Sequence, residues 1–313
     1  MRFLVSARYP DDASVERWAV AALAANILIV LTGGLVRLTG SGLGCPTWPK
    51  CTDESFVPHS ELGIYGVIEF SNRMLTYVLV FVVVATFIAV RRWSSTNRTM
   101  RRLALIIALG VPFQAVIGGI SVLTDLNPWI VSLHLILSMG LVATSTVLLV
   151  RVRGGSATQP QRAAYVIATY VVMWVVVYLG TIVTGSGPHA GDDEAPRNGL
   201  DPQVMSHVHA ASVYVLVALT LVLCFLLRDE ARKLAWILLA VELAQGTIGF
   251  VQYFTDLPIA LVAAHLVGAG LLVVAGTRLL LAVVSPATAR AAPPASASDQ
   301  ESAAPRPQPQ AGH

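Results

Sequence analysis

The fold is decided by the stretch QAVIGGISVLTDLNPWIVSLHLIL, residues 114–137. The same polar residues recur at the same offsets in QGTIGFVQYFTDLPIALVAAHLVG, residues 245–268. Each stretch begins with a glutamine, Gln114 or Gln245, and continues through a Thr-Asp-Leu tripeptide to a histidine, His134 or His265. The two members of each pair stand 131 residues apart. Apolar similarity alone does not place polar residues at equal offsets, so the match predicts an internal repeat.

The repeat extends beyond these two stretches. The tetrapeptide TGSG occurs at residues 39–42 and again at 184–187, and Asn72 in NRMLTYVLV aligns with His209 in HAASVYVLV. Each half contains four apolar runs, and an even number per half makes the repeats parallel, related by an axis along the membrane normal. We therefore expect two four-helix bundles built on one plan.

Composition indicates a membrane protein. Of the 313 residues, 55% are apolar and 12% are charged, and the mean hydropathy is +0.68. A soluble domain carries about 25% charged residues, so a disordered chain, a nucleic-acid-binding surface and an ordinary cytosolic enzyme are excluded. The predicted fold class is an all-α polytopic membrane protein with eight transmembrane helices. The predicted spans are Trp18–Leu38, Val67–Val90, Leu103–Leu123, Trp129–Val150, Ala163–Val183, Met205–Leu227, Leu234–Phe254 and Ile259–Val283.

Positive charge sets the predicted orientation. Seventeen of the 21 Lys and Arg residues fall at the N-terminus, in alternate connections or after the last span, whereas only Lys50 and Arg197 fall on the opposite side. By the positive-inside rule both termini are cytoplasmic, the loops 39–66 and 184–204 face outside, and the expected location is the cell (plasma) membrane. The predicted parts are a cytoplasmic N-terminus (1–17), an N-terminal four-helix half (18–151), a cytoplasmic linker (152–162), a C-terminal four-helix half (163–283) and a disordered cytoplasmic tail (284–313).

Two histidines of the second half, His209 and His265, are predicted to lie at similar depth near the outer ends of their spans. Ionisable groups within spans are costly and usually functional. Two facing imidazoles on neighbouring helices of a bundle form an axial ligand pair for haem iron, which is our prediction for this pair. The alternatives are interhelical hydrogen bonds and a zinc site, but no Cys or carboxylate cluster accompanies the pair as zinc would require.

The first half keeps a histidine, His134, but has Asn72 where the second half has His209. Asparagine is a poor iron ligand, so we expect an open or weak axial position, which suits a substrate that arrives and leaves. Glu69 precedes Asn72 by nearly one helical turn at the outer boundary, where a carboxylate is a usable proton acceptor or donor. The alternative is an interfacial glutamate that faces water. The equivalent position in the second half is Ser206, so chemistry is expected in the first half alone.

Two arginines and two cysteines complete the predicted outer face. Arg37 and Arg73 lie near the outer span ends, where they either bind haem propionates or snorkel to the interface. Cys45 and Cys51 bracket Pro-Thr-Trp-Pro-Lys in the first outer loop, and an oxidising compartment makes a disulfide plausible there. Such a disulfide either braces the loop or exchanges electrons during catalysis.

Together these segments resemble the CtaA/Cox15 family of haem A synthases. The resemblance is carried by GGLVRLTGSGLGCPTWPKC (33–51), IEFSNRMLT (68–76), TGSGPHAG (184–191), SHVHAASVY (206–214) and the two stretches that run from Thr-Asp-Leu to histidine. It covers residues 18–283, which include all eight predicted spans, and it excludes the tail.

The resemblance implies a membrane oxidoreductase that oxidises the C8 methyl group of haem O to a formyl group, through successive hydroxylations and loss of water. It implies that His209 and His265 bind haem b in the second half, and that His134 binds haem O in the first. The family's catalytic glutamate falls on Glu69. Its second substrate-site histidine falls on Asn72, which leaves single ligation by His134 or an Asn72 contact through water. A haem O synthase and the terminal cytochrome oxidase are the implied protein partners.

Two other functions fit parts of the pattern. A b-type cytochrome that only transfers electrons also needs His209 and His265, but it does not need Glu69 or an asymmetric first half. A secondary transporter also contains internal repeats, but it tends to carry charges at the membrane midplane. Here we expect no acidic residue at the centre of any span.

Overall fold

The computed structural model describes residues 11–155 and 159–284, and within these ranges the secondary structure is entirely helical. The expected disordered tail falls almost wholly on residues 285–313, outside the described residues. The helices are α1 (Asp12–Leu38), η1 (Ser60–Leu62), α2 (Gly63–Arg92), α3 (Arg98–Leu123), α4 (Pro128–Val152), η2 (Pro160–Arg162), α5 (Ala163–Ser186), α6 (Pro202–Leu226), α7 (Asp229–Phe254) and α8 (Ile259–Val284).

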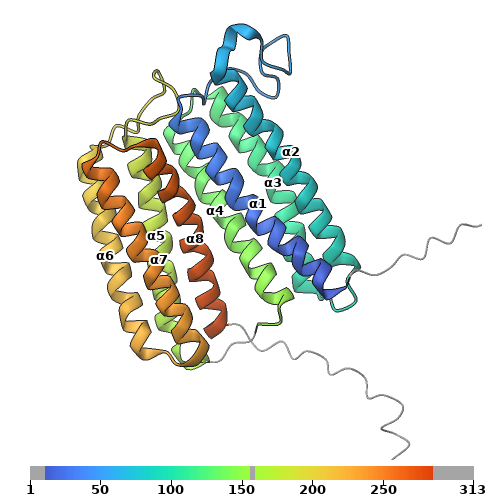
Figure 1. The fold of residues 1–313 in the computed structure, drawn as a ribbon, viewed down its shortest axis with the longest axis vertical. Helices are drawn as coiled ribbons and strands as arrows, with labels where there is room; N and C mark the ends of the chain where they lie inside the picture. Colours follow the sequence, from blue (N-terminus) through green and yellow to red (C-terminus); the bar gives the residue numbers. More distant parts are fainter. Residues whose placement is uncertain (1–10, 156–158, 285–313) are drawn as a thin grey trace, which may run out of the picture.

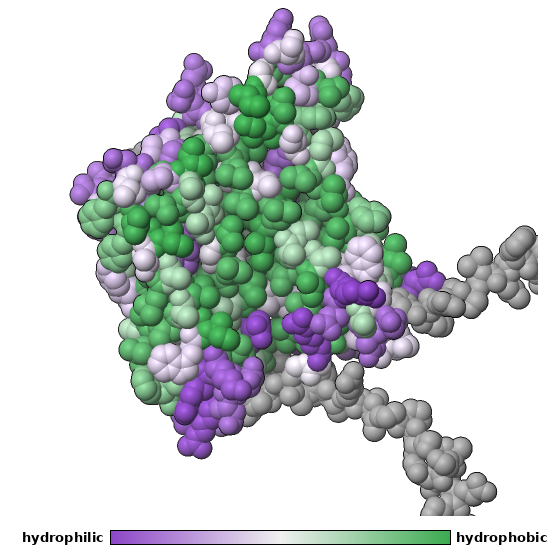
Figure 2. Space-filling view, in the orientation of Figure 1, coloured by the Kyte–Doolittle hydropathy of each residue, from purple (hydrophilic) through white to green (hydrophobic). Residues whose placement is uncertain are grey.

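Eight of the described helices are long and apolar enough to cross a bilayer, which confirms the predicted fold class of a multi-pass membrane protein. Figure 2 shows apolar side chains covering the middle of the molecule, with hydrophilic side chains concentrated toward its two ends. Several helices are longer than the predicted spans, and α1 begins at Asp12 rather than Trp18. The apolar run predicts only the part of a helix that lies in the hydrocarbon core of the membrane. The helix itself begins earlier, where the side chain of Asp11 caps the N-terminus of α1.

The helices fall into two sets of four, which lie side by side in Figure 1. Within the first set α1 contacts α2 and α4, and α3 contacts the same two helices; α5–α8 are arranged likewise. The sets meet where α1 and α4 pack against α8, and α4 also packs against α5. The ends of α1 and α8 nearest the termini lie at one end of the molecule, and the loop after α1 projects from the other.

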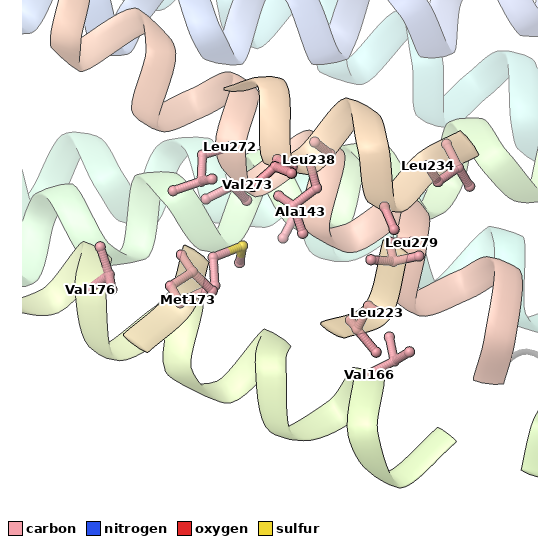
Figure 3. Close-up of a cluster of buried hydrophobic side chains, with 14 of the residues drawn as sticks. Ala143, Val166, Met173, Val176, Leu223, Leu234, Leu238, Leu272, Val273 and Leu279 are labelled. Atoms are coloured by element: carbon pink, nitrogen blue, oxygen red, sulfur yellow. The ribbon is translucent and has the colours of Figure 1, made fainter. Parts of the chain in front are cut away.

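The largest buried apolar cluster joins the two sets. It contains Met139 and Ala143 of α4 together with residues of all four helices of the second set. Figure 3 shows Met173 of α5 and Leu272 of α8 in this cluster, with Ala143 nearby. Because lipid offers helices no hydrophobic drive to associate, close van der Waals packing of this kind must hold the sets together.

The two Thr-Asp-Leu tripeptides form the same turn. Asp125 and Leu126 have positive φ angles of 51° and 58°, and Asp256 and Leu257 have φ angles of 57° and 55°. In both turns the leucine N–H donates to a carbonyl five residues earlier in the preceding helix, that of Ser121 (2.7 Å) or Gln252 (2.9 Å). Two consecutive non-glycine residues with positive φ angles are uncommon. Their occurrence in both Thr-Asp-Leu turns agrees with the internal repeat predicted from the sequence.

Candidate functional site

The three candidate histidines lie close to one end of the molecule, each on a different helix. His134 is the seventh residue of α4, His209 the eighth of α6 and His265 the seventh of α8. At 1.5 Å per residue, each lies about 10 Å from the start of its helix. His209 and His265 belong to the same helix set, but the prediction that they lie on neighbouring helices was wrong, because α6 and α8 each contact α5 and α7 and do not contact each other within the described residues.

The imidazoles carry buried nitrogen atoms that have no hydrogen-bond partner. Nδ1 of His134, Nδ1 of His209 and Nδ1 of His265 are all in this condition. A buried polar atom without a partner costs free energy unless a ligand or a water satisfies it. For Nδ1 of His134, interhelical hydrogen bonds therefore give no account, whereas the rings of His209 and His265 also interact with the backbone of Val176 on α5 and of Gln245 on α7.

A glycine on the neighbouring helix faces each candidate ligand position. A Cβ atom on Gly118 would lie 3.3 Å from Cε1 of His134. The equivalent distances are 3.3 Å from Gly180 to Cε1 of His209, 3.5 Å from Gly249 to Cε1 of His265, and 3.9 Å from Gly33 to Nδ2 of Asn72. These glycines leave space for a side chain or a flat ligand to approach the helix backbone closely.

Two glutamines brace the histidine-bearing helices. Nε2 of Gln114 donates to the backbone carbonyl of His134 (2.9 Å), and Nε2 of Gln245 donates to that of His265 (2.8 Å). The sequence identified both glutamines as repeat markers and gave them no role. The structure shows that each ties α3 or α7 to the backbone of a candidate ligand.

Asn72 is already engaged by the neighbouring helix. Its Oδ1 accepts a hydrogen bond of 2.8 Å from the hydroxyl group of Thr32 on α1. The amide oxygen therefore points to α1, and the amide nitrogen lies near Gly33. Nothing in this arrangement replaces the missing imidazole, so His134 is the single strong candidate ligand of the first helix set.

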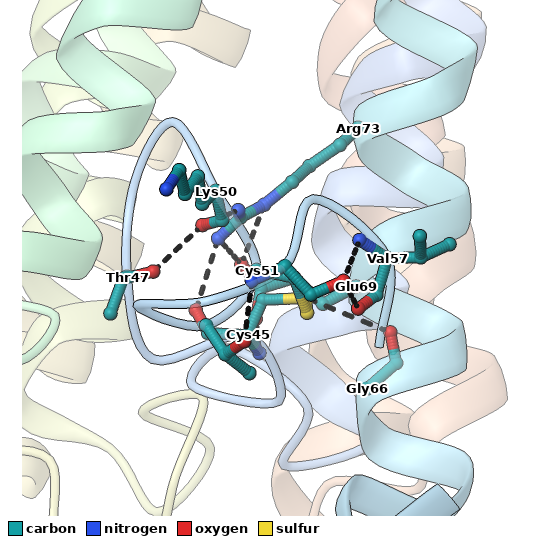
Figure 4. Close-up of a disulfide and its surroundings, with 10 residues drawn as sticks. Cys45, Thr47, Lys50, Cys51, Val57, Gly66, Glu69 and Arg73 are labelled. Atoms are coloured by element: carbon teal, nitrogen blue, oxygen red, sulfur yellow. Dashed lines mark hydrogen bonds and ion pairs between the residues drawn. A yellow bond between two sulfur atoms is a disulfide. The ribbon is translucent and has the colours of Figure 1, made fainter. Parts of the chain in front are cut away.

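Glu69 is buried, with 5% of its surface exposed, so the alternative of an interfacial glutamate that faces water is wrong. Its Oε1 accepts hydrogen bonds from Nε and Nη2 of Arg73, and its Oε2 accepts one of 2.6 Å from the backbone N–H of Cys45. Arg73 also donates to the backbone carbonyls of Cys45 and Lys50, both at 3.0 Å (Figure 4). This pair therefore fastens the first outer loop to α2.

The predicted disulfide is present between Cys45 and Cys51, and both cysteines are fully buried. Arg37 serves the second outer loop as Arg73 serves the first, since it donates to the backbone carbonyls of His189 and Thr184. It also lines a cleft of about 470 Å³ between the two loops. The propionate-binding role of both arginines stays a prediction.

The expectation that no span carries a central acidic residue was wrong. Glu242 lies in the middle of α7 and is 2% exposed. Its Oε1 accepts a hydrogen bond of 2.7 Å from the hydroxyl group of Thr220, whereas its Oε2 is buried and has no partner among the residues that the structure describes. The acid was visible in the sequence, inside the predicted seventh span.

These residues fit a tetrapyrrole better than a metal ion held by side chains alone. Within the described ranges, no group of three or more His, Cys, Asp or Glu side chains is placed to hold a metal ion, which leaves the zinc alternative without a ligand set. A haem supplies four nitrogen ligands itself and needs only axial ligands from the protein. His134, His209 and His265 meet that need, because each has a buried Nδ1 without a hydrogen-bond partner among the described residues and each faces a glycine.

The fold and site define the class: a multi-pass helical membrane protein with one or two candidate axial histidines in each of two four-helix sets. The model of the COX15-CtaA family, described as cytochrome oxidase assembly protein, matches residues 16–277, and this chain belongs to that family.

Curated relatives agree with this assignment. The chain is 28% identical over 271 residues to a protein of Bacillus pumilus named "Heme A synthase", an alignment that covers 76% of this chain and 85% of the relative. It is 27% identical over 232 residues to a protein of the same name from Halalkalibacterium halodurans, with 67% and 76% covered. A third protein of that name, from Listeria welshimeri, is 31% identical over 118 residues, with 37% and 38% covered.

Proposed function

We propose that this protein is a haem A synthase, a membrane oxidoreductase that converts haem O to haem A. The observation that carries the proposal is a set of three half-buried histidines at one end of both helix sets, whose Nδ1 atoms are buried without a hydrogen-bond partner among the described residues, in a chain of the COX15-CtaA family. In the proposed reaction the C8 methyl group of haem O gains two hydroxyl groups from water in successive hydroxylations that release four electrons and four protons to an external acceptor, and the resulting diol loses one water to give the formyl group.

His209 and His265 are the proposed axial ligands of a haem b cofactor in the second helix set. When bound, haem b would supply a one-electron carrier between the substrate and an acceptor. Gln245 holds the backbone of His265 in place, and Gly180 and Gly249 leave room beside the two rings. The apolar cluster of the second helix set extends to Val213 on α6 and to Leu266, the residue after His265 on α8.

The first helix set is the proposed substrate site, with His134 as the ligand of the haem O iron. The Asn72 amide, bonded to Thr32, leaves the opposite position weak, which favours exchange of substrate and product. Glu69 is the proposed proton acceptor at the outer boundary, and a proton would bind one of its carboxylate oxygens in exchange for a hydrogen bond from Arg73 or from the Cys45 N–H. Arg37 and Arg73 are the proposed partners of the haem propionates.

The proposed location is the cell membrane, with both termini cytoplasmic and the haem sites near the outer face. This follows from the distribution of Lys and Arg between alternate connections. A haem O synthase and cytochrome oxidase are the proposed partners for delivery of haem O and release of haem A.

One observation favours a second candidate, a b-type cytochrome that performs no porphyrin chemistry. Both carboxylate oxygens of Glu69 are occupied by Arg73 and by the Cys45 N–H. A purely structural Glu69 would suit a protein that only transfers electrons through the second helix set. The two candidates differ in whether haem O or haem A accompanies haem b.

Pigment extraction with mass spectrometry separates these candidates. Wild-type protein is expected to yield haem b together with haem O or haem A. His265→Ala should lose haem b, and His134→Ala should lose the substrate haem while it keeps haem b. His207→Ala is the matched control, because this exposed histidine lies two residues from His209. Haem b as the sole pigment from active membranes would favour the cytochrome.

Glu69→Gln tests the proposed proton acceptor. Glutamine keeps one oxygen that can accept from the Cys45 N–H, and although the ion pair with Arg73 is lost, Arg73 can still donate to the carbonyls of Cys45 and Lys50, so the loop should stay in place while proton uptake is lost. We expect haem O to accumulate and haem A to fall at least tenfold, with the disulfide intact by thiol titration. Normal haem A production in this variant would remove the proposed role.

A further inference from the structure

The outer loop places an aromatic side chain against the first helix set beside His134. Trp48 lies between the two disulfide-bonded cysteines, and its indole ring covers Gly119 of α3 so closely that a Cβ atom there would overlap it. Gly118, the preceding residue, is the one that faces the imidazole of His134. Trp48 and His134 therefore contact adjacent residues of the same helix.

Trp48 and His134 are also at matching depth. Gly119 lies four residues before the end of α3, and His134 is the seventh residue of α4. At 1.5 Å per residue these positions are about 6 Å and 9 Å from the loop that joins the two helices. The indole thus reaches into the outer part of the helix set, where it is partly buried.

The loop around Trp48 is held at many points. The disulfide closes residues 45–51 into a ring, and Arg73 donates to the carbonyls at both ends of that ring, Cys45 and Lys50. Glu69 accepts from the N–H of Cys45, and the Thr47 hydroxyl donates to the Lys50 carbonyl at 2.9 Å (Figure 4). This many contacts on a seven-residue loop fix the direction of its central side chain.

The second helix set has no such arrangement. Its outer loop, residues 187–201, contains no tryptophan, and the position equivalent to Gly119 is Phe250, which is exposed. A phenylalanine there leaves no flat backbone surface for an inserted indole. The tryptophan–glycine pair is therefore confined to the helix set that lacks a second histidine.

We propose that Trp48 is a substrate-binding residue that forms the outer aromatic wall of the haem O site and packs against the macrocycle. This inference rests on the proposed function of the first helix set. An indole offers a large rigid apolar face to a flat ring, a contact of moderate strength. In this arrangement Glu69 and Arg73 also support substrate binding indirectly, in addition to their proposed direct roles, because they hold the loop that presents Trp48.

Haem O titration of protein that retains its second-site haem b tests the proposal. Difference spectra give the dissociation constant at the first site, while haem b content and thiol titration report on the fold and the disulfide. Trp48→Ala should weaken haem O binding about tenfold, the equivalent of about 1.4 kcal/mol. Trp48→Phe should change it less than threefold. Gly119→Ala should weaken binding as Trp48→Ala does, because its Cβ displaces the indole.

Trp129→Ala is the matched control, since this tryptophan is the second residue of α4 and half of its surface is exposed. Unchanged haem O affinity in Trp48→Ala, with haem b and disulfide retained, would overturn the inference. If Trp48→Ala loses haem b, haem O titration of Trp48→Leu tests the inference instead. Leucine fills part of the volume of the indole but has no aromatic face, so it should weaken haem O binding about tenfold as well. Wild-type protein that holds haem b but takes up no haem O would contradict the proposed function itself.

Discussion

Gln245 on α7 donates a hydrogen bond of 2.8 Å to the backbone carbonyl of His265 on α8. Gln114 makes the same bond to His134 in the other helix set, at 2.9 Å, and it also donates to the hydroxyl of Ser138. The two bonds are independent, because one belongs to α3 and α4 and the other to α7 and α8. Each candidate haem site thus has its own interhelical brace.

Gln245→Ala should therefore affect haem b alone. The lost hydrogen bond should lower the free energy of unfolding by about 1 kcal/mol and speed dissociation of haem b. Gln114→Ala is the matched variant, and it should leave haem b retention unchanged. Thermal unfolding in detergent and the rate of haem b loss to an acceptor globin measure both effects. Equal rates of haem b loss from Gln245→Ala and Gln114→Ala would contradict the independence of the two hydrogen bonds.

Gly249→Val should abolish haem b binding, whereas Gly249→Ala should not. A Cβ on Gly249 lies 3.5 Å from Cε1 of His265, an ordinary contact, but the two further methyl groups of valine must displace the ring. Gly246→Val is the control, because nothing lies within 4 Å of a Cβ at Gly246 and both changes carry the same helix propensity. The visible absorption spectrum measures the loss. Six-coordinate haem b in Gly249→Val at wild-type occupancy would exclude the proposed packing.

Thr220→Val should destabilise the protein through Glu242. Within the described part of the chain the Thr220 hydroxyl alone donates to the Glu242 carboxyl group, and its removal leaves that buried group unsatisfied, at a cost of about 1–3 kcal/mol. Thr146→Val is the control, since this buried hydroxyl bonds to a carbonyl of its own helix.

The double variant Thr220→Val, Glu242→Leu extends this prediction. Replacing both polar partners with apolar groups should recover most of the lost stability, because the buried carboxyl group is removed together with its donor. Detergent unfolding of the two single variants and the double variant gives the coupling between the residues. Additive losses in the double variant would mean that the hydrogen bond contributes little.

Arg73→Gln should expose the disulfide to reduction. Arg73 fastens the loop through Glu69 and two backbone carbonyls, and Cys45 and Cys51 have no exposed surface. The lost charge-assisted hydrogen bonds are worth about 1.5–3 kcal/mol. Their loss should raise the fraction of molecules in which the loop is detached from α2 about tenfold or more, and the rate of disulfide reduction by a membrane-impermeant phosphine should rise by the same factor. Arg197→Gln, in the other outer loop, is the control. Equal reduction rates in wild type and Arg73→Gln would show that other contacts hold the loop.

Hydropathy and polar spacing were enough to predict the eight spans, because a helix in lipid must satisfy its own hydrogen bonds and show an apolar surface. The same information identified His134, His209 and His265, since a polar residue within an apolar run is conspicuous at any depth. Glu242 was equally visible and was missed, so that error came from interpretation and not from the sequence.

By itself, the sequence determined the number of spans, the repeat of polar residues and the chemical types available near one end of the helices. Tertiary structure alone decided that Glu69 is buried and accepts a hydrogen bond from the Cys45 N–H. It also decided that a glycine faces each candidate ligand and that Trp48 covers Gly119. The physical reason is that hydropathy and helical spacing act locally along the chain. Contacts between helices depend on the rotation of each helix about its axis and on the path of a loop, and both are set by packing between residues far apart in the sequence.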